Sequence, residues 1–370
     1  MKEPARVLQI VATMGMGGIE NFLMNLYRSI DKGKVQFDFL ILNTDNNFFE
    51  NEIKNLGGKV YKIVSPKKSG YFKFLRNLKD FFLKNPTYKI VHSHYNILNG
   101  IILNQAYKCK VKLIISHSHS TNSGYSILKK ICLQYSKFLL KKIPSKKLAC
   151  SKKAGIWLYG KNMNFKIIHN GIDLLKYKYN YEIKIRKRKE LGIANDDIVI
   201  GHIGTFRKVK NHNFLINIFF ELYKKNKKYK LILVGDGDLK EEVKAKVDKL
   251  GLSKIVIFLG IRNDVEELLQ VFDIFLFPSL YEGLPVSLVE AQAAGLKSFI
   301  SDSITKEIDF GSDLIEFISL NKSALEWAEI IEEKRRYKRE SKLEVIQKNG
   351  YDIKKTSEEL VEIYLGEKNI

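Results

Sequence analysis

The sequence predicts an α/β protein with two doubly wound domains. Short apolar runs rich in β-branched residues alternate with longer segments of helical periodicity along the chain. This alternation is typical of parallel sheets built from βαβ units. The chain has 370 residues, too many for one ordinary core, and 45% of them are hydrophobic, enough to fill two. We therefore expect two Rossmann-like domains that face each other across a cleft.

The expected strands form two series. In the first half they lie at residues 7–12, 37–42, 60–64, 90–93, 113–116, 148–151 and 166–168. In the second half they lie at residues 198–204, 230–235, 255–260, 273–278 and 297–301. Each strand is followed by a turn or a helical pattern, as a doubly wound fold requires.

The boundary between the domains is expected near residue 175. Residues 172–190 lose both periodicities and gain charge, which is typical of a linker. The first domain then takes residues 1–175 and the second takes 176–351. The amphipathic segment 352–370 is expected to form a helix, which could pack on either half and which we assign to the first domain.

The composition excludes several classes of protein. Cys109, Cys132 and Cys150 form no C-x-x-C pair and have no histidine at zinc-like spacing, so neither a disulfide framework nor a metal cluster is indicated. The first apolar run is too short for a signal peptide, and no apolar run reaches the roughly 18 residues of a membrane span. These features favour a reducing, cytoplasmic setting.

The formal net charge of +22 calls for an anionic partner or surface. Nucleic acid, anionic lipid and phosphorylated small molecules are the candidates. The alternative is that lysine is the default surface residue of this protein and that the charge has no specific partner.

A glycine-rich loop follows the first expected strand, T-M-G-M-G-G-I-E-N at 13–21. Ligands of doubly wound sheets bind beyond the carboxyl ends of the strands. Gly17 and Gly18 open a helix at this end, where close backbone approach and free N–H groups favour a diphosphate. A tight turn without a ligand is the structural alternative.

Two loops of the second half carry charged residues. In G-T-F-R-K-V-K-N-H-N-F at 204–214, Arg207, Lys208 and Lys210 could neutralise phosphate oxygens, or could be solvated surface side chains. In V-G-D-G-D-L at 234–239, Asp236 and Asp238 form a D-x-D pattern that suits a divalent metal. We favour an ordinary strand-to-helix turn there, with Asp238 as the helix cap.

Histidines cluster at the ends of two expected strands, as H-S-H-Y at 92–95 and S-H-S-H-S at 116–120. We expect the two rings of each H-x-H pair to lie on opposite faces, so that one of each pair faces the cleft. Zinc needs three or four converging ligands, and no cysteine or glutamate accompanies these residues. A hydrogen-bonding or acid–base role is favoured, with plain strand-end histidines as the alternative.

Two glutamates flank a short apolar run in Y-E-G-L-P-V-S-L-V-E at 281–290. Glu282 lies in the loop before an expected helix, and Glu290 lies about one and a half turns inside it. The two carboxylates could accept hydrogen bonds from hydroxyls at two places on a ligand, while the backbone N–H groups of Gly283 and Leu284 hold a phosphate. A sugar–diphosphate–ribose molecule has this alternation. A capped helix with a solvated glutamate is the alternative.

These residues resemble a known family. E-G-L-P-V-S-L-V-E resembles the E-x7-E element of retaining glycosyltransferases of family four, which have the two-domain B-type fold (GT-B), and the likeness is greatest to enzymes of bacterial capsular and exopolysaccharide synthesis. Further segments match in order along nearly the whole chain: G-G-I-E-N (17–21), V-H-S-H-Y (91–95), H-S-H-S-T (117–121), C-S-K-K-A-G (150–155), H-N-G-I-D (169–173), K-N-H (210–212), L-V-G-D-G (233–237), L-G-I-R-N-D-V (259–265) and F-P-S-L-Y-E-G-L-P (277–285).

The resemblance implies a role for each matched residue. Glu290 would hold the nucleotide ribose and Glu282 the transferred sugar, while His94 would stand near the reacting centre and His119 on the acceptor side. The remaining donor contacts fall on two sets of residues: Gly17, Gly18 and Lys210 at the diphosphate, and Gly260, Ile261 and Arg262 beside the base.

Two positions depart from the family pattern. The family carries arginine directly after the glycine that ends the strand, whereas this chain has Thr205 there and Arg207 two residues later. Either Arg207 replaces that arginine from a shifted loop, or one phosphate contact is lost. The proline that usually precedes N-G-I-D is His169 here.

The resemblance implies transfer of a sugar from a nucleotide donor, a UDP-sugar, to a lipid-linked saccharide, without a metal or other cofactor. The second domain would bind the donor and the first the acceptor, at the inner face of the plasma membrane and with no nucleic acid. The alternatives are a nucleotide-sugar epimerase of the same fold and, from a different class, a basic nucleic-acid-binding protein.

Two basic amphipathic segments suit an anionic membrane surface. From Lys129 to Lys153 there are nine lysines and no acidic residue, with Leu128, Ile131, Tyr135, Phe138 and Leu139 at helical spacing. The segment 66–84 combines Tyr71, Phe74, Leu75, Leu78 and Phe82 with basic neighbours. Either could hold the protein at a bilayer, and helices that turn their apolar faces to the core are the alternative.

Overall fold

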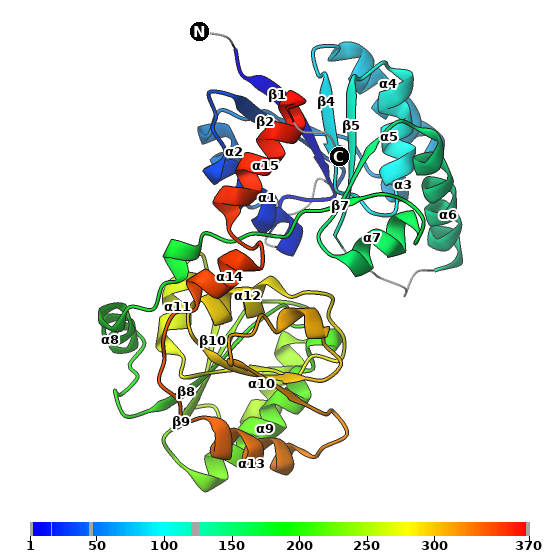
Figure 1. The fold of residues 1–370 in the computed structure, drawn as a ribbon. Helices are drawn as coiled ribbons and strands as arrows, with labels where there is room; N and C mark the ends of the chain where they lie inside the picture. Colours follow the sequence, from blue (N-terminus) through cyan, green and yellow to red (C-terminus); the bar gives the residue numbers. More distant parts are fainter. Residues whose placement is uncertain (1–2, 16, 44–46, 120–125, 368–370) are drawn as a thin grey trace. The chain divides into compact units, whose positions relative to one another are not determined.

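The computed structural model describes residues 3–15, 17–43, 47–119 and 126–367, and the chain divides into two compact units (Figure 1). Unit 1 comprises Met1–Ile172 together with Asp352–Ile370, and unit 2 comprises Asp173–Tyr351. The boundary expected from the sequence falls just after this division, inside the short 3-10 helix η1 (Leu174–Tyr177).

Unit 1 contains a parallel sheet of seven strands in the order β3-β2-β1-β4-β5-β6-β7. The strands are β1 (Ala5–Val11), β2 (Val35–Ile41), β3 (Val60–Lys62), β4 (Ile90–Ser93), β5 (Leu113–Ser118), β6 (Lys146–Ala149) and β7 (Lys166–Ile167). Its helices are α1 (Gly18–Ser29), α2 (Glu50–Asn55), α3 (Pro66–Ser69), α4 (Tyr71–Lys84), α5 (Asn99–Lys108), α6 (Ile127–Lys142), α7 (Lys152–Tyr159) and α15 (Ile353–Leu365).

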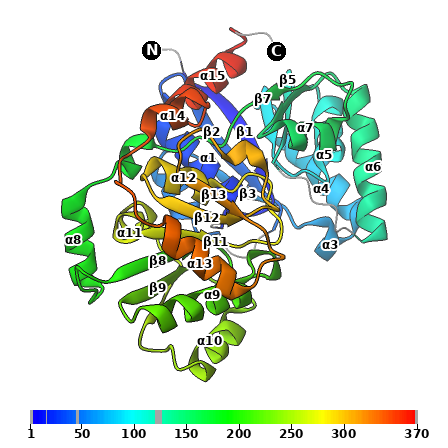
Figure 2. The same ribbon diagram turned by 60° about the horizontal axis from the view of Figure 1, so that its bottom comes forward.

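Helices cover both faces of this sheet (Figures 1 and 2). Alternate residues of β1 point to opposite sides, so Leu8 and Ile10 pack in the core under α4 to α7 while Val7 and Val11 pack in the core under α1, α2 and α15. Both sides are therefore dry, which explains why the strands are nearly continuous apolar runs.

Unit 2 contains a parallel sheet of six strands in the order β10-β9-β8-β11-β12-β13. The strands are β8 (Ile198–Ile203), β9 (Tyr229–Val234), β10 (Val256–Gly260), β11 (Ile274–Phe277), β12 (Lys297–Ser301) and β13 (Ile315–Ile318). The helices are α8 (Tyr181–Glu190), α9 (His212–Lys225), α10 (Lys240–Lys249), α11 (Val265–Val271), α12 (Val286–Ala293), α13 (Ala324–Lys334) and α14 (Leu343–Lys348), with the 3-10 turns η1, η2 (Lys208–Lys210) and η3 (Lys306–Ile308). Two parallel doubly wound sheets confirm the expected fold class.

The C-terminal helix α15 belongs to unit 1, although almost the whole of unit 2 precedes it in the sequence. It packs beside α1 and β1 (Figure 1). Its residues Ile353, Leu360, Ile363 and Tyr364 are buried in the core shared with those elements. Asp352 caps its first turn by accepting a hydrogen bond from the backbone N–H of Lys354 at 3.0 Å.

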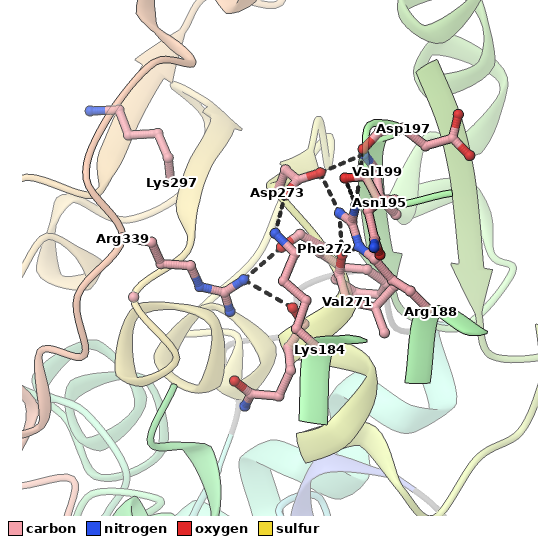
Figure 3. A network of polar contacts seen from close by, with 12 residues as sticks. Lys184, Arg188, Asn195, Asp197, Val199, Val271, Phe272, Asp273, Lys297 and Arg339 are labelled. Carbon is pink, nitrogen blue, oxygen red and sulfur yellow. Dashed lines mark hydrogen bonds and ion pairs between the residues drawn. The ribbon is translucent and has the colours of Figure 1, made fainter. Parts of the chain in front are cut away.

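The segment expected to be an irregular linker contains the helix α8, so that expectation was wrong. The helix has no apolar stripe. Ion pairs and hydrogen bonds, and not an apolar face, attach it to the rest of unit 2. The buried guanidinium of Arg188 donates to the carbonyls of Val271 and Asp197 and pairs with Asp273 at 2.6 Å, and Lys184 pairs with the same carboxylate at 2.7 Å (Figure 3). Periodicity of apolar residues cannot reveal a helix held in this way.

The edge strand β13 was also not predicted. It is only Ile315–Ile318 and pairs with β12 alone, and three of its four residues are half-buried. A short strand of this kind carries little apolar signal.

No helix in the described part of the chain is both long and apolar enough to cross a membrane.

Candidate functional site

Each sheet has one point where the strand order reverses, between β1 and β4 in unit 1 and between β8 and β11 in unit 2. Ligands of doubly wound folds bind beyond the carboxyl ends of the strands at these points. The loops that leave these four strands hold the candidate residues: Gly17 and Gly18 after β1, His94 after β4, Thr205 to Lys210 after β8, and Glu282 after β11. The topology therefore groups most of them at two switch points.

Lys210 and Glu282 meet at the switch point of unit 2. The Lys210 Nζ atom lies 2.8 Å from Glu282 Oε1 and 4.4 Å from the centre of the Phe277 ring, and both side chains are mostly shielded from solvent. Two hydrogen bonds tie the loops together: Asn211 Nδ2 donates to the Pro278 carbonyl at 3.1 Å, and the Leu280 N–H donates to the Val209 carbonyl at 2.8 Å. A phosphate could replace Glu282 as the partner of Lys210, and a hydroxyl could replace Lys210 as the partner of Glu282.

Glu290 lies on α12, one turn beyond its first residue. Its Oε1 atom accepts a hydrogen bond of 2.8 Å from the hydroxyl of Tyr177, which comes from η1. The pKa of Glu290 is raised to about 7, mainly by burial and to a smaller extent by the charge of Glu266, although the hydrogen bond from Tyr177 lowers it. This carboxyl therefore changes charge near neutral pH.

The other donor-side candidates of unit 2 lie on exposed or half-buried loops. Thr205 and Arg207 are exposed, and within the described part of the chain the Arg207 side chain has no hydrogen-bond partner, so it is available to a phosphate. Gly260 ends β10 with a φ of 66°, the left-handed region that favours glycine. Ile261 beside it is exposed, and Arg262 pairs with Asp264 at 2.7 Å. The loop residues Gly283 and Leu284 are exposed and half-buried, respectively.

The D-x-D segment forms a turn, but not in the way expected. The N-cap of α10 is Leu239 and receives no side-chain cap, so Asp238 is not the cap. Asp236 instead accepts from the Gly237 N–H at 2.7 Å and from Lys240 Nζ at 2.8 Å. The sequence could not distinguish these aspartates, because either one could fold back on a following N–H.

The glycine loop of unit 1 leads into α1 through Gly17, which is its N-cap and has no side chain to cap it. A Cβ atom at Gly17 would collide with the carboxylate of Glu20, whose Oε1 accepts from the Thr13 hydroxyl at 2.6 Å. At Gly18 a Cβ atom would meet open space. A side chain at the first glycine would require the Glu20 carboxylate to move, and the second glycine leaves the helix start accessible.

Four histidines gather at the switch point of unit 1. The ring centres of His92 and His94 are 4.2 Å apart, and those of His117 and His119 are 4.0 Å apart. The expectation that each pair splits between opposite faces was wrong, because residues two apart along a strand point to the same face. Ser120 and Thr121 of the second histidine motif lie outside the described residues.

A hydrogen-bonded chain orders these rings. Gln9 Nε2 donates to the Tyr364 hydroxyl at 3.3 Å, and Gln9 Oε1 lies 2.8 Å from His94 Nε2. An amide oxygen only accepts, so His94 carries its proton on Nε2 and its Nδ1 accepts from His119 Nε2 at 2.8 Å. The tautomer of His94 is therefore set from outside the histidine cluster.

The cluster is suited to neutral imidazoles. Burial lowers the pKa of His92, His94 and His117 well below its usual value, with neighbouring imidazoles adding to the effect, and burial lowers the pKa of His119 to about 3. Three of these histidines offer nitrogens within 4.8 Å of one another. The rings of His92 and His117, however, are stacked with their planes 3° apart, so their lone pairs lie in parallel planes and do not converge on one ion.

Three residues of these networks were missed in the sequence, namely Tyr177, Gln9 and Tyr364. Gln9 had a signal, because it is the one polar residue inside the apolar run V-L-Q-I-V and is fully buried. Tyr177 and Tyr364 had none, since a tyrosine in an amphipathic or irregular segment is ordinary. Their partners, Glu290 and Gln9, are each more than a hundred residues away.

Two doubly wound parallel sheets with polar clusters at both switch points define the class of two-domain α/β proteins that includes the GT-B glycosyltransferases. Residues 183–308 match the family described as "Glycosyl transferases group 1". The chain is 37% identical to the putative glycosyltransferase EpsF of Bacillus subtilis (strain 168), over 97% of this chain and 96% of that protein. It is 26% identical to the capsular polysaccharide biosynthesis glycosyltransferase CapH of Staphylococcus aureus, over 97% and 98%.

Solved structures share the fold. The Anabaena protein Alr3699/HepE in complex with UDP and glucose superposes with a TM-score of 0.76 at 18% identity, covering 98% of this chain and all of that one. The lipopolysaccharide glycosyltransferase WaaG superposes with a TM-score of 0.73 at 16% identity, covering 97% and 100%. The chain belongs to the group 1 glycosyltransferases, which confirms the family expected from its motifs.

Proposed function

We propose that this glycosyltransferase moves a sugar, with retention of anomeric configuration, from a UDP-sugar to a lipid-linked saccharide in capsular or exopolysaccharide synthesis. The observation that carries the proposal is the ion pair between Lys210 and Glu282 at the switch point of unit 2, with Glu290 on the helix that follows. A cation and two carboxylates in this order suit a ligand that alternates sugar, diphosphate and ribose.

Relatives support the choice of donor and acceptor. Alr3699/HepE has been solved with UDP-glucose. A 148-residue part of this chain, 39% of its length, is 31% identical to the Escherichia coli UDP-Gal:alpha-D-GlcNAc-diphosphoundecaprenol alpha-1,3-galactosyltransferase. That name describes a UDP-sugar donor and an acceptor sugar on a lipid diphosphate, and we propose substrates of the same classes here.

Lys210 and Glu282 exchange partners when the donor binds. The diphosphate takes the ammonium group of Lys210, and a hydroxyl of the transferred sugar donates to the carboxylate of Glu282. When the bond from the anomeric carbon to the diphosphate oxygen breaks, negative charge grows on that oxygen. Lys210 stabilises this charge, and Arg207 adds a second cation. On the family motif alone, we propose that the backbone N–H groups at Gly17 and Gly18 also donate to the diphosphate. These groups take the part that a divalent metal plays elsewhere, so we propose transfer without a metal.

Retention follows, in this proposal, from attack on the face that the diphosphate leaves, and no covalent nucleophile is assigned. His94 and His119 act as neutral hydrogen-bonding groups near the reacting centre and the acceptor, because their lowered pKa values keep them uncharged at neutral pH. Their shared hydrogen bond of 2.8 Å holds the two rings in one orientation.

An anionic bilayer is the proposed site of action, because the acceptor is lipid-linked. On α6, Leu128, Ile131, Tyr135 and Phe138 form a row whose side chains are about half or more exposed, with Lys129, Lys130 and Lys142 beside them. We call this set the α6 surface. An exposed apolar row edged by lysines is typical of a helix that lies on a negatively charged membrane.

The donor site is tested with Lys210→Ala and Glu282→Ala. Each is expected to lower turnover with a UDP-sugar at least about a hundredfold, since each removes a group that contacts the reacting part of the donor. Turnover is measured by transfer to a lipid-linked acceptor, and folding is checked by circular dichroism. Lys249→Ala, an exposed lysine at the end of α10 in the same unit, is the control and should retain near-normal turnover.

Near-normal turnover in both site variants would overturn the assignment. The same assay separates the competing functions. A product that forms from the donor in the absence of any acceptor would indicate an epimerase, and no saturable binding of UDP would exclude a UDP-dependent enzyme.

A further inference from the structure

Tyr177 lies at the start of unit 2, on η1, and is almost completely buried, with 8% of its surface exposed. It packs against α12, and its hydroxyl donates to Glu290 Oε1 at 2.8 Å. None of the motifs that identify the family includes this residue. The hydroxyl is nevertheless the one described donor to the carboxylate that is proposed to bind the ribose.

The hydrogen bond divides the two oxygens of Glu290 between the protein and a ligand. Oε1 is taken by Tyr177, and within the described part of the chain no donor approaches Oε2. A carboxylate fixed through one oxygen has a set plane, so the other oxygen presents its lone pairs in a fixed direction. Oε2 is then the acceptor offered to a ribose hydroxyl.

Most of the surroundings of Glu290 disfavour its charged form, whereas the hydrogen bond from Tyr177 favours it. Burial and, to a smaller extent, the carboxylate of Glu266 on α11 raise the pKa of Glu290, which lies at about 7. The hydrogen bond from Tyr177 is the contribution that lowers this pKa. No titratable group described on β12 or α14, the other elements packed on α12, adds to these effects.

Tyr177 remains a donor throughout the range in which Glu290 titrates. Its own pKa is raised well above 10, by burial first and then by the neighbouring charge of Glu290. The phenol therefore keeps its proton while the carboxyl gains or loses one.

We propose that Tyr177 is a positioning residue for the nucleotide donor, which holds Glu290 charged and directs its free oxygen toward the ribose. This inference rests on the proposed function, because it takes the ribose as the ligand of Glu290. It adds a residue outside the recognised motifs, and it adds pH as a condition for donor binding. Protonation of Glu290 turns a hydrogen-bond acceptor into a hydrogen-bond donor. The affinity for the nucleotide should therefore fall as the pH decreases through about 7.

The test is Tyr177→Phe in the full-length protein, with UDP as the probe and calorimetric titration between pH 5.5 and 9. The variant should lose affinity for UDP about tenfold at pH 7 but less than about twofold at pH 9, because without the hydroxyl Glu290 releases its proton only at higher pH. The pH at which affinity is half-lost should therefore move upward. A residue with only a packing role would weaken binding equally at every pH.

Tyr229→Phe is the matched control. Tyr229 is a buried tyrosine of the same unit that donates to Glu332 Oε1 at 2.5 Å, on the far helix α13. Its replacement removes the same kind of bond and should leave the pH profile of UDP binding unchanged. Equal profiles for Tyr177→Phe and the unmodified protein, or a uniform loss at all pH values, would overturn the inference.

A second measurement separates this inference from the proposed function. Carboxyl carbon NMR of glutamate-labelled protein, with Glu290→Gln to assign the signal, gives the pKa of Glu290 without any ligand. An unmodified protein that binds no UDP would refute the proposed donor, whereas an unchanged Glu290 pKa in Tyr177→Phe would refute the role of Tyr177.

Discussion

At the scale of single residues, the charged form of Glu290 opposes folding. Its pKa rises from 4.5 to about 7 when the chain folds, mainly through burial. Between these values the folded protein binds a proton that the unfolded chain releases. The contribution of this group to stability is therefore fully present below about pH 4.5 and is lost as the pH rises through 7.

Replacement of Glu290 by glutamine should separate stability from binding. Glu290→Gln keeps an acceptor for Tyr177 but carries no charge, so the free energy of unfolding of unit 2 should rise by roughly 2 kcal/mol at pH 8 and change little at pH 4. Binding of UDP should weaken at the same time. Urea denaturation followed by Trp327 fluorescence in a Trp157→Phe background reports on unit 2, since the chain has two tryptophans.

Glu329→Gln, an exposed position on α13, is the control for removing a carboxylate and should show no such pH-dependent gain. A loss of stability in Glu290→Gln that is equal at both pH values would contradict the prediction, because it would mean that the charged form is not penalised.

Single residues also show what a sequence can and cannot predict about a site. The loops that carry Lys210 and Glu282 were found because strand ends and family motifs mark them. The donor to Glu290 was not found, because the contact of Tyr177 with Glu290 joins positions 113 apart. The histidine pairs show a different failure, in which the residues were correctly singled out but the faces were assigned against the two-residue repeat of a strand.

At the scale of elements, two helices with similar sequences have different roles. On α4, Phe74, Leu78 and Phe82 are buried in the core of unit 1, so the apolar side of the segment 66–84 is not available to a membrane. On α6 only Leu139 of the apolar residues named from the sequence is buried, and the rest of that row is exposed. Helical spacing predicts an apolar side, but the sheet decides which side is covered.

The α6 surface should bind anionic vesicles. Lys129→Glu, Lys130→Glu and Lys142→Glu combined should lower the partition coefficient onto vesicles with 30% phosphatidylglycerol by at least about a hundredfold, since each lysine near such a surface contributes about 1 kcal/mol and each glutamate adds repulsion. Cosedimentation measures the partition coefficient, and binding of the unmodified protein should fall as salt rises.

The matched control reverses three exposed lysines of unit 2, Lys227, Lys249 and Lys254, to glutamate. It makes the same change in net charge at residues that are not part of the α6 surface, and it should leave most of the binding intact. Equal binding of the unmodified protein to neutral and anionic vesicles would contradict the electrostatic account.

At the scale of the whole molecule, the domain order along the chain is interrupted, because unit 1 is completed by a helix from the C-terminal segment. The fold class followed from the alternation of apolar runs and helical patterns, whereas the order of the strands in each sheet came only from the structure. The amphipathic pattern alone could not predict that α15 packs on unit 1, because such a pattern shows that a helix has an apolar side but does not specify the element that covers it.

Leu360→Ala should therefore destabilise unit 1 and not unit 2. Leu360 is fully buried against β1 and α1, and its truncation should cost about 3 kcal/mol. Hydrogen exchange measured by mass spectrometry should show faster exchange in β1, β2 and α1 and no change in β8, β9 and α9. Leu365→Ala on the same helix, where the side chain is partly exposed, should have little effect, and faster exchange in unit 2 would contradict the prediction.

The position of α15 has a consequence for the order in which the protein matures during translation. Domains commonly fold in the order in which they leave the ribosome. Here the later unit has its full set of residues once Tyr351 has emerged, whereas the earlier one must wait for Leu360, Ile363 and Tyr364. The half of the protein that is synthesised first is thus the last to complete its core, and part of its apolar face stays uncovered until α15 has been made.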